Sequence, residues 1–216
     1  MIKEAIVVAG SRGIGHAISN SLTEAGLKVN ATSKSMLDTS DLSSVKSFIS
    51  NNPETDVLVL NTGGPPAIDF QDIQESDFIK YHNQLFLSFC LMLQNIWVRD
   101  GGYVFLVSSF NIKEPNQKLI LSNSYRIAFT SVLKSLSKML AERNVTCINL
   151  APGPIKTERL FSLVDNMEEF EKQLPLGRAA EPRELGDLVK AIVENNIKYL
   201  NGVTINFDGG HSNYVL

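Results

Sequence analysis

The sequence predicts a single-domain α/β fold in which a doubly wound parallel sheet is covered by helices on both faces. Short apolar runs without polar alternation, typical of strands buried on both faces, alternate with helix-like segments along the chain. A glycine-rich turn, Gly10–Gly15, follows the first apolar run and opens the first helical segment. The 216 residues suffice for one substantial core, and no repeat or linker divides them.

The first predicted elements surround the glycine turn. Residues 5–9 have the pattern of a central strand, and residues 15–25 have that of the helix after the turn. Residues 27–32 predict a second strand, and residues 45–50 predict a second helix. Because strands and helices alternate, we expect neighbouring strands to be parallel.

The middle of the chain continues this alternation. Residues 56–60 form another buried-strand run, and Gly63-Gly64-Pro65-Pro66 ends it because neither a strand nor a helix continues through these residues. A long helix is expected over 76–98, ended by Gly101-Gly102, and residues 103–107 predict the next strand.

The last third of the chain completes the sheet. A helix is predicted over 124–142 and a strand over 145–150. Residues 157–175 have mixed charge and no sharp period, so we expect a small lid there. A helix over 183–195 and a closing strand over 202–207 follow, and we expect seven strands in all.

The composition argues against several classes of partner. A net charge of −3 gives no positive surface for nucleic acid or an anionic membrane. Cys90, Cys147 and three scattered histidines support neither a disulfide framework nor a metal site by local spacing. The start has no secretory-signal pattern, and the longest apolar stretch, residues 85–93, is too short to span a bilayer. We therefore expect a cytoplasmic protein with a small-molecule partner and no metal.

The glycine turn predicts nucleotide binding. Gly10, Gly13 and Gly15 allow positive φ and close backbone approach, and free N–H groups at the start of the next helix point at an anion. A strand, such a turn and a helix in succession are how a Rossmann fold holds the pyrophosphate of a dinucleotide. The alternative is a turn without a ligand. The position between first strand and first helix favours dinucleotide binding.

The end of the second strand favours NADP(H) over NAD(H). NAD-binding proteins place an acidic residue there, on the ribose 2′-hydroxyl. This chain has Thr32-Ser33-Lys34 instead, and Arg12 lies in the turn, so a hydroxyl and two cations are offered to a 2′-phosphate. The alternative for Arg12 and Lys34 is that they are solvated surface cations, and NAD(H) stays the second cofactor to test.

Five short motifs in order resemble those of the short-chain dehydrogenase/reductase family. They are the glycine turn, Asn61-Thr62-Gly63-Gly64, Val107-Ser108-Ser109, Pro152-Gly153-Pro154-Ile155-Lys156-Thr157 and Asp208-Gly209-Gly210. Residues 175–178 and 181–185 are also similar to the stretch before the last helix of 3-oxoacyl-acyl-carrier-protein reductases. The resemblance covers nearly the whole chain. It implies oxidoreduction of a carbonyl or secondary alcohol, and a homo-oligomer (dimer or tetramer) with interface helices over 76–98 and 124–142.

The resemblance also implies which residues hold the cofactor. The turn would contact the pyrophosphate, and Asp38, after the third strand, would contact the adenine. Asn61 and Gly63 would contact the ribose, and residues 152–157 would contact the nicotinamide. Only Ser35 and Met36 separate Lys34 from Leu37, where most members have a helix, so a more open adenosine pocket is expected. The candidate cofactor-binding residues are Gly10, Ser11, Arg12, Gly13, Ile14, Gly15, Ser33, Lys34, Asp38, Asn61, Gly63, Arg126, Pro152, Gly153, Ile155 and Thr157.

The catalytic residues depart from the family pattern, in which a Tyr follows a Ser by thirteen residues and a Lys follows the Tyr by four. Ser109 matches the Ser, but Ser122 and Arg126 stand at the other two positions. The family's Tyr is the general acid, and a serine is a far poorer acid than a phenol of pKa about 10. Arg126 can still hold the ribose. Tyr125 is an alternative acid or a packed aromatic, and Asn83 is a candidate for the family's structural Asn.

Three functions therefore stay open. An NADP(H)-dependent oxidoreductase would hold the carbonyl with Ser109 and take its proton from Tyr125 or from water ordered by Ser122 and Arg126. A dinucleotide-binding protein with little or no turnover would keep the glycine turn and lack the Tyr. Halohydrin dehalogenases also have Arg in place of Lys, but they keep the Tyr and have lost the nucleotide. The intact turn and Ser122 argue against that third function.

Overall fold

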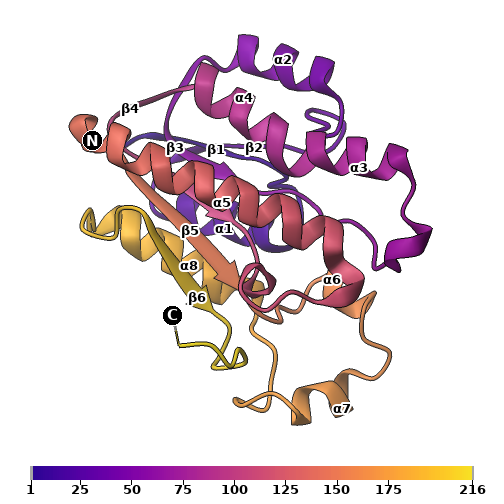
Figure 1. Ribbon diagram of the computed structural model, residues 1–216. Helices are drawn as coiled ribbons and strands as arrows, with labels where there is room; N and C mark the ends of the chain where they lie inside the picture. The colour runs from indigo at the N-terminus through magenta and orange to yellow at the C-terminus, as the bar shows by residue number, and fades with distance from the viewer. Residues whose placement is uncertain (1, 216) are drawn as a thin grey trace.

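Six parallel strands form the centre of the computed structural model, which describes residues 2–215 (Figure 1). β2 lies beside β1 on one side of the central pair β1 and β3, and β4, β5 and β6 follow on the other side. The strands are therefore added in both directions from the centre, which confirms the predicted doubly wound topology. The strands are β1 (Glu4–Val7), β2 (Lys28–Ala31), β3 (Glu54–Leu60), β4 (Trp97–Val107), β5 (Thr146–Pro152) and β6 (Val203–Phe207), in the order β2-β1-β3-β4-β5-β6.

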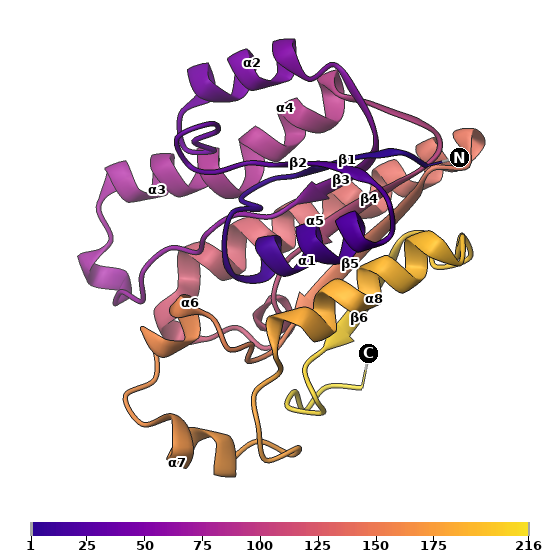
Figure 2. The same ribbon diagram turned by 180° about the vertical axis from the view of Figure 1, so that it is seen from behind.

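Helices cover both faces of this sheet. On one face lie α1 (Gly13–Glu24) and α8 (Pro182–Glu194), which Figure 2 shows in front of the strands. On the other face lie α2 (Leu42–Asn51), α4 (Ser88–Asn95) and α5 (Ile120–Leu140). None of the helices within residues 2–215 is long and apolar enough to cross a membrane.

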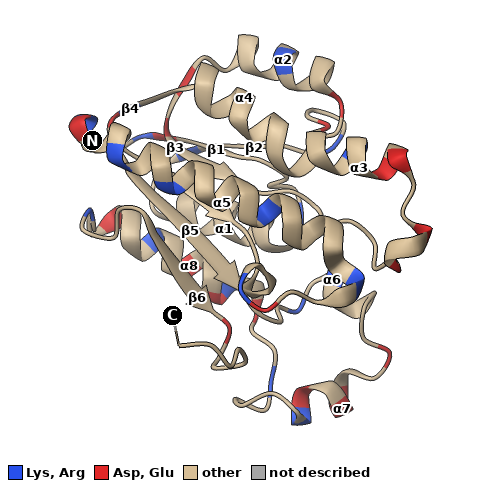
Figure 3. Cartoon of the chain, viewed as in Figure 1, with Lys and Arg blue, Asp and Glu red and all other residues tan. Residues whose placement is uncertain are grey.

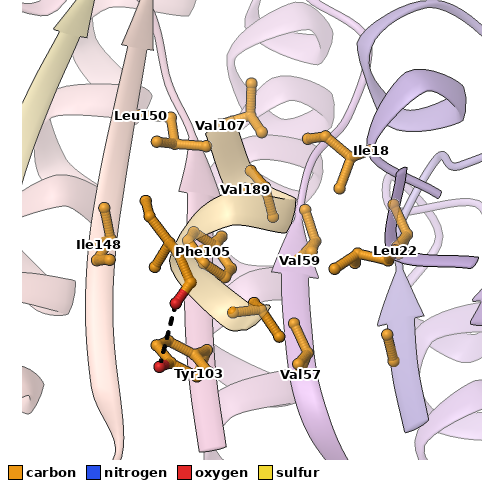
Figure 4. Close-up of a cluster of buried hydrophobic side chains, with 14 of the residues drawn as sticks. Ile18, Leu22, Val57, Val59, Tyr103, Phe105, Val107, Ile148, Leu150 and Val189 are labelled. Carbon is orange, nitrogen blue, oxygen red and sulfur yellow. Dashed lines mark hydrogen bonds between the residues drawn. The ribbon is translucent and has the colours of Figure 1, made fainter. Parts of the chain in front are cut away.

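The two faces share the strands by alternation, because successive strand side chains point to opposite sides. On β3, Val57 and Val59 pack toward α1 and α8, whereas Leu58 and Leu60 pack toward α2 and α4. Figure 4 shows the first of these clusters, with Val189 of α8 over the strand side chains. Burial on both faces explains why the strands appear in the sequence as continuous apolar runs.

The expectation of seven strands is wrong for the described residues, because the third strand implied before Asp38 does not form. The backbone N–H groups of Met36 and Leu37 both donate to the carbonyl of Ser33, which closes a tight turn directly after β2. Too few residues remain there for a helix and a further strand. β2 is therefore an edge of the sheet, and the adenosine side of the fold lacks the element that would flank it.

The long helix expected over 76–98 ends earlier and is not regular. It consists of α3 (Glu75–His82), a π-helical turn (Asn83–Leu87) and α4. The expected end at Gly101-Gly102 is wrong, since Trp97 already begins β4, where it pairs with Glu54. The two glycines lie inside β4 at a register shift, and Gly101 has a φ of +77°.

The lid lies beyond the carboxyl ends of the strands, after β5. The expected lid contains two short helices, α6 (Glu158–Phe161) and α7 (Met167–Lys172), at the lower right of Figure 1. α5 begins at Ile120, four residues before its predicted start, so Ser122 is helical. Single 3₁₀ turns are found at η1 (Phe70–Asp72), η3 (Phe110–Ile112), η4 (Gln117–Leu119) and η5 (Ala141–Arg143).

Candidate active site

A cleft of about 1200 Å³ opens at the carboxyl ends of the strands. It is lined by the turn after β1, the loops after β3, β4 and β5, and the lid, which is the crevice where doubly wound sheets bind ligands. Gly10, Gly15, Ser33 and Tyr125 are candidate residues that do not line it. The candidates that do line it are Ser11, Arg12, Gly13, Ile14, Lys34, Asp38, Asn61, Gly63, Ser109, Ser122, Arg126, Pro152, Gly153, Ile155 and Thr157.

The glycines of the turn serve two different purposes. Gly13 has a positive φ of +55°, which a glycine adopts without strain. The residue just before the motif, Ala9, also has a positive φ, of +50°. Gly10 and Gly15 are needed for close packing instead: a Cβ on Gly10 would lie 2.8 Å from the Ser19 Oγ, and one on Gly15 would lie 2.2 Å from the Ala9 carbonyl oxygen. They hold α1 tightly against the end of β1.

The start of α1 fits the pyrophosphate of a dinucleotide. Arg12 is the N-cap residue, and no side-chain oxygen accepts a hydrogen bond from the first turn of the helix. That first turn also has no acidic residue. Uncapped N–H groups and the positive end of the helix dipole therefore face the cleft, the arrangement that binds phosphate groups.

The two cations predicted for a 2′-phosphate both line the cleft, Lys34 in the turn after β2 and Arg12 at the start of α1. Lys34 lies 3.6 Å from the Asp38 carboxylate, and Arg12 lies 3.4 Å from Glu158; both cations are about three-quarters exposed. Burial raises the pKa of Asp38, but hydrogen bonds from Ser40 and the charge of Lys34 outweigh it and hold that pKa below its ordinary value. Both cations stay accessible from the cleft.

The opposite side of the cleft brings Ser109, Ser122 and Arg126 together at the ends of β4 and α5. Ser122 and Arg126 are buried, and the Arg126 Nε donates to the Ser122 Oγ at 3.2 Å. Arg126 also donates to the carbonyl oxygens of Val107, at 2.7 Å, and Thr62, at 3.3 Å. Since Ser122 accepts from Arg126, its own O–H stays free to donate.

Tyr125 is turned away from this group. Its phenol donates to the backbone carbonyl of Phe78 at 3.1 Å, and its ring packs edge-on against His82. Burial raises the pKa of the phenol, which makes it a weaker acid than a free tyrosine. The structure does not bring Tyr125 to the cleft, so the packed-aromatic alternative describes it.

The structure adds two cleft residues that the sequence did not single out. Gln84, in the π-helical turn, donates to the carbonyl of Gly63 at 2.7 Å and fixes the loop after β3. Its neighbour Asn83 does not line the cleft. Arg159, on α6 of the lid, reaches across the cleft and donates to the carbonyl of Pro65. π-helical turns often mark functional sites, but the sequence pattern does not reveal this one, so only the structure could point to Gln84.

Comparison with protein families gives a match over most of the chain. The sequence model of a family described as enoyl-(acyl carrier protein) reductase matches residues 36–212. Acetoacetyl-CoA reductase of Shinella zoogloeoides is 25% identical, over 97% of this chain and 98% of the relative. The 3-oxoacyl-acyl-carrier-protein reductase of Salmonella typhimurium is also 25% identical, over 96% of each chain.

Solved structures share the fold over nearly the full length. A blue fluorescent protein from a metagenomic library, in complex with NADPH, has a TM-score of 0.86 and 22% identity, covering 98% of both chains. A 3-oxoacyl-(acyl-carrier-protein) reductase from Agrobacterium tumefaciens C58, with NADP bound, has a TM-score of 0.85 and 22% identity, covering 96% of this chain and 93% of the other. At these identities the likeness shows the fold.

Proposed function

The chain belongs to the short-chain dehydrogenase/reductase family, and from that membership and the cleft we propose that it binds NADP(H) and reduces a carbonyl or oxidises a secondary alcohol. One observation carries the proposal. The uncapped phosphate turn, the accessible cations Arg12 and Lys34, and the polar group around Ser109 all line one cleft. This spacing along a single crevice matches an extended dinucleotide with its reacting end at Ser109.

The two cations support NADP(H) as the cofactor. Arg12 and Lys34 stand where a 2′-phosphate would project, and the carboxylates nearest to them, Glu158 and Asp38, each already neutralise one of them. A 2′-phosphate would replace or share these pairs with charge-assisted hydrogen bonds. The solved relatives with NADPH and NADP bound agree with this choice.

The catalytic side provides hydrogen-bond donors but no tuned acid. When bound, NADP(H) would supply the hydride chemistry, and the residues of the cleft would position the carbonyl. Ser109, which accepts only the backbone N–H of Asn111, and Ser122 can both donate to the carbonyl oxygen as negative charge develops there. Arg126 adds positive charge behind Ser122. Because neither hydroxyl readily gives up its proton, water supplies the proton in our proposal, and a low turnover is expected.

Binding and turnover are tested separately. We expect NADPH to bind saturably, more tightly than NADH, in isothermal titration calorimetry. We expect its oxidation, followed by absorbance, with at least one substrate of a carbonyl panel. Ser109→Ala should keep NADPH affinity and lower turnover by about 100-fold, the usual cost of one oxyanion donor. Inactivity across a broad panel would contradict the oxidoreductase proposal while leaving cofactor binding intact.

A second function is favoured by one feature, the absence of a tyrosine phenol among the cleft-lining residues of the described chain. A cofactor-binding protein without turnover would need only the phosphate turn and the cations. The double variant Ser122→Tyr, Arg126→Lys separates the two functions. Carbonyl reduction that rises in this variant supports a working but slow reductase site, and continued inactivity with intact NADPH binding supports the binding function.

The homo-oligomer is also a proposal. Phe78 and Ile79 on α3 and Ile127 on α5 are 36–57% exposed, on two helices that pack against each other. No Asp or Glu lies on α4 or α5, as Figure 3 shows. We propose that these helices pack against a second copy across a two-fold axis. Sedimentation velocity should give a dimer or tetramer in the wild type, and Ile79→Glu should shift it toward monomer; a monomeric wild type would contradict the proposal.

A further inference from the structure

The arginines of the chain divide into two groups by their partners. Arg126 and Arg159 have no carboxylate within 4.0 Å among residues 2–215, and both line the catalytic side of the cleft. The arginines that do have a carboxylate partner within that distance are Arg12, Arg99, Arg143, Arg178 and Arg183. Lack of a carboxylate partner is therefore a local property of this part of the cleft.

Arg126 is a buried cation with only neutral partners. Its side chain contacts one hydroxyl and two carbonyl oxygens, which use three of the five guanidinium N–H groups. Burial, and after it the charge of Arg159, lowers the pKa of Arg126 to about 10. A cation buried without a counter-ion is costly, and structures normally pair it.

Arg159 places a second guanidinium near the first. It extends from α6 to the carbonyl of Pro65, and its guanidinium packs on Gly64, where an added Cβ would lie 3.7 Å from its Nε. Its pKa is lowered by burial. Because Arg159 belongs to the lid and Arg126 to the body of the fold, an anion between them would join the two parts.

The carboxylates that line the cleft do not supply this anion. They are Asp38, which is paired with Lys34, and Glu158, which precedes Arg159 on α6 but is paired with Arg12. The phosphate turn follows β1, whereas Arg126 binds the carbonyls that follow β3 and end β4. The pyrophosphate and 2′-phosphate of a bound cofactor therefore have their own donors, one or two strands away.

We propose that Arg126 and Arg159 bind a carboxylate of the substrate, so that the substrate class is a small oxo acid or its hydroxy acid. That the substrate is a carbonyl compound or an alcohol rests on the proposed function, and that it carries a carboxylate rests on the two arginines. A carboxylate accepts paired N–H groups from guanidinium in a planar fork, which fixes its orientation. Held in this way it would draw the lid over the carbonyl presented to Ser109.

The binding test uses a ligand that cannot be reduced. Malonate and its neutral analogue malonamide are titrated by calorimetry into the protein saturated with NADP⁺. We expect malonate to bind and malonamide not to bind. Arg159→Gln should weaken malonate binding by about tenfold or more, the loss of one bidentate ion pair. The control Arg178→Gln removes the same charge outside the cleft and should leave malonate binding unchanged.

Three results would overturn the inference: no malonate binding, equal binding of malonamide, or unchanged malonate affinity in a folded Arg159→Gln variant. A fourth result would assign the arginines to a cofactor phosphate instead: Arg159→Gln weakens NADP⁺ binding, and saturating NADP⁺ abolishes the malonate site. Thermal melts confirm that each variant is folded. Arg159 is chosen over Arg126 because it is only half-buried, so its substitution is better tolerated.

Turnover gives a separate test that distinguishes this inference from the proposed function. Acetoacetate and methyl acetoacetate carry the same ketone and differ in the free carboxylate. A preference for acetoacetate in kcat/KM that is lost in Arg159→Gln supports the inference. Malonate binding without turnover of any carbonyl refutes the oxidoreductase proposal alone. Turnover of the ester as fast as the acid refutes the oxo-acid class alone.

Discussion

Replacing Gly15 with alanine tests how the phosphate turn is built. An added Cβ would lie 2.2 Å from the Ala9 carbonyl oxygen and 2.8 Å from the Asn61 Nδ2, far inside ordinary contact, which begins at 3.4 Å. The closest atom is backbone, so no side-chain rotation relieves the contact and α1 must move away from β1. Overpacking of this kind costs about 1–3 kcal/mol, and we expect the upper half of that range.

The same shift displaces the N–H groups at the start of α1. Loss of two charge-assisted hydrogen bonds worth about 1.5 kcal/mol each predicts NADPH binding weaker by about 100-fold. Urea denaturation measures the first effect and calorimetric titration the second. The control is Gly64→Ala, whose Cβ would meet nothing closer than the Arg159 Nε at 3.7 Å and should leave the free energy of unfolding unchanged. A Gly15→Ala protein with wild-type stability and NADPH affinity would refute the reasoning.

Three further substitutions probe other parts of the structure. Lys34→Glu should weaken NADPH binding by about tenfold without weakening NADH binding, because it reverses an exposed charge beside the 2′-phosphate and places a carboxylate where the ribose 2′-hydroxyl of NADH can donate to it; equal losses for both cofactors would count against that placement. Tyr125→Phe should cost about 1 kcal/mol of stability, the hydrogen bond to Phe78, without slowing carbonyl reduction; slower reduction at unchanged NADPH affinity would make the phenol part of the reaction. Asp56→Asn should lower the free energy of unfolding by about 2 kcal/mol at pH 7. Burial raises the pKa of Asp56, but two backbone N–H groups at the start of β1 and Arg99 together hold it below its ordinary value. The stability that Asp56 provides is present above its unfolded pKa of about 3.9 and is lost as the pH falls through the lower folded pKa. The difference between the two proteins should therefore shrink in acid, and a difference that stays constant as the pH is lowered below about 3.9 would contradict this.

Much of the fold was predictable because the sheet is buried on both faces. A strand such as β3 then has apolar residues toward both faces, and the sequence shows residues 57–60 as a continuous run. The expected seventh strand is absent from the described residues because residues 33–37 form a local turn directly after β2. The prediction of where the long helix ends was wrong because the local sequence at Trp97 and Val98 is compatible with a helix as well as a strand. Their pairing with Glu54 and Thr55, which are distant in the sequence, places them in β4.

The site was predictable where it follows strand ends and helix spacing. Ser122 and Arg126 share a helix face at i and i+4, and they do hydrogen bond. Tyr125 lies about 60° round the helix from Ser122 on the side away from Arg126, and spacing alone did not decide which side meets the cleft. Arg159 was missed because the lid has no periodic pattern, and its position depends on a contact with the loop after β3.

A crystal structure with NADP⁺ tests the central claim most directly. We predict the pyrophosphate on the N–H groups at the start of α1, the 2′-phosphate between Arg12 and Lys34, and the nicotinamide C4 closer to Ser109 and Ser122 than to Tyr125. A nucleotide bound outside this cleft, or one whose nicotinamide points away from Ser109, would contradict the account.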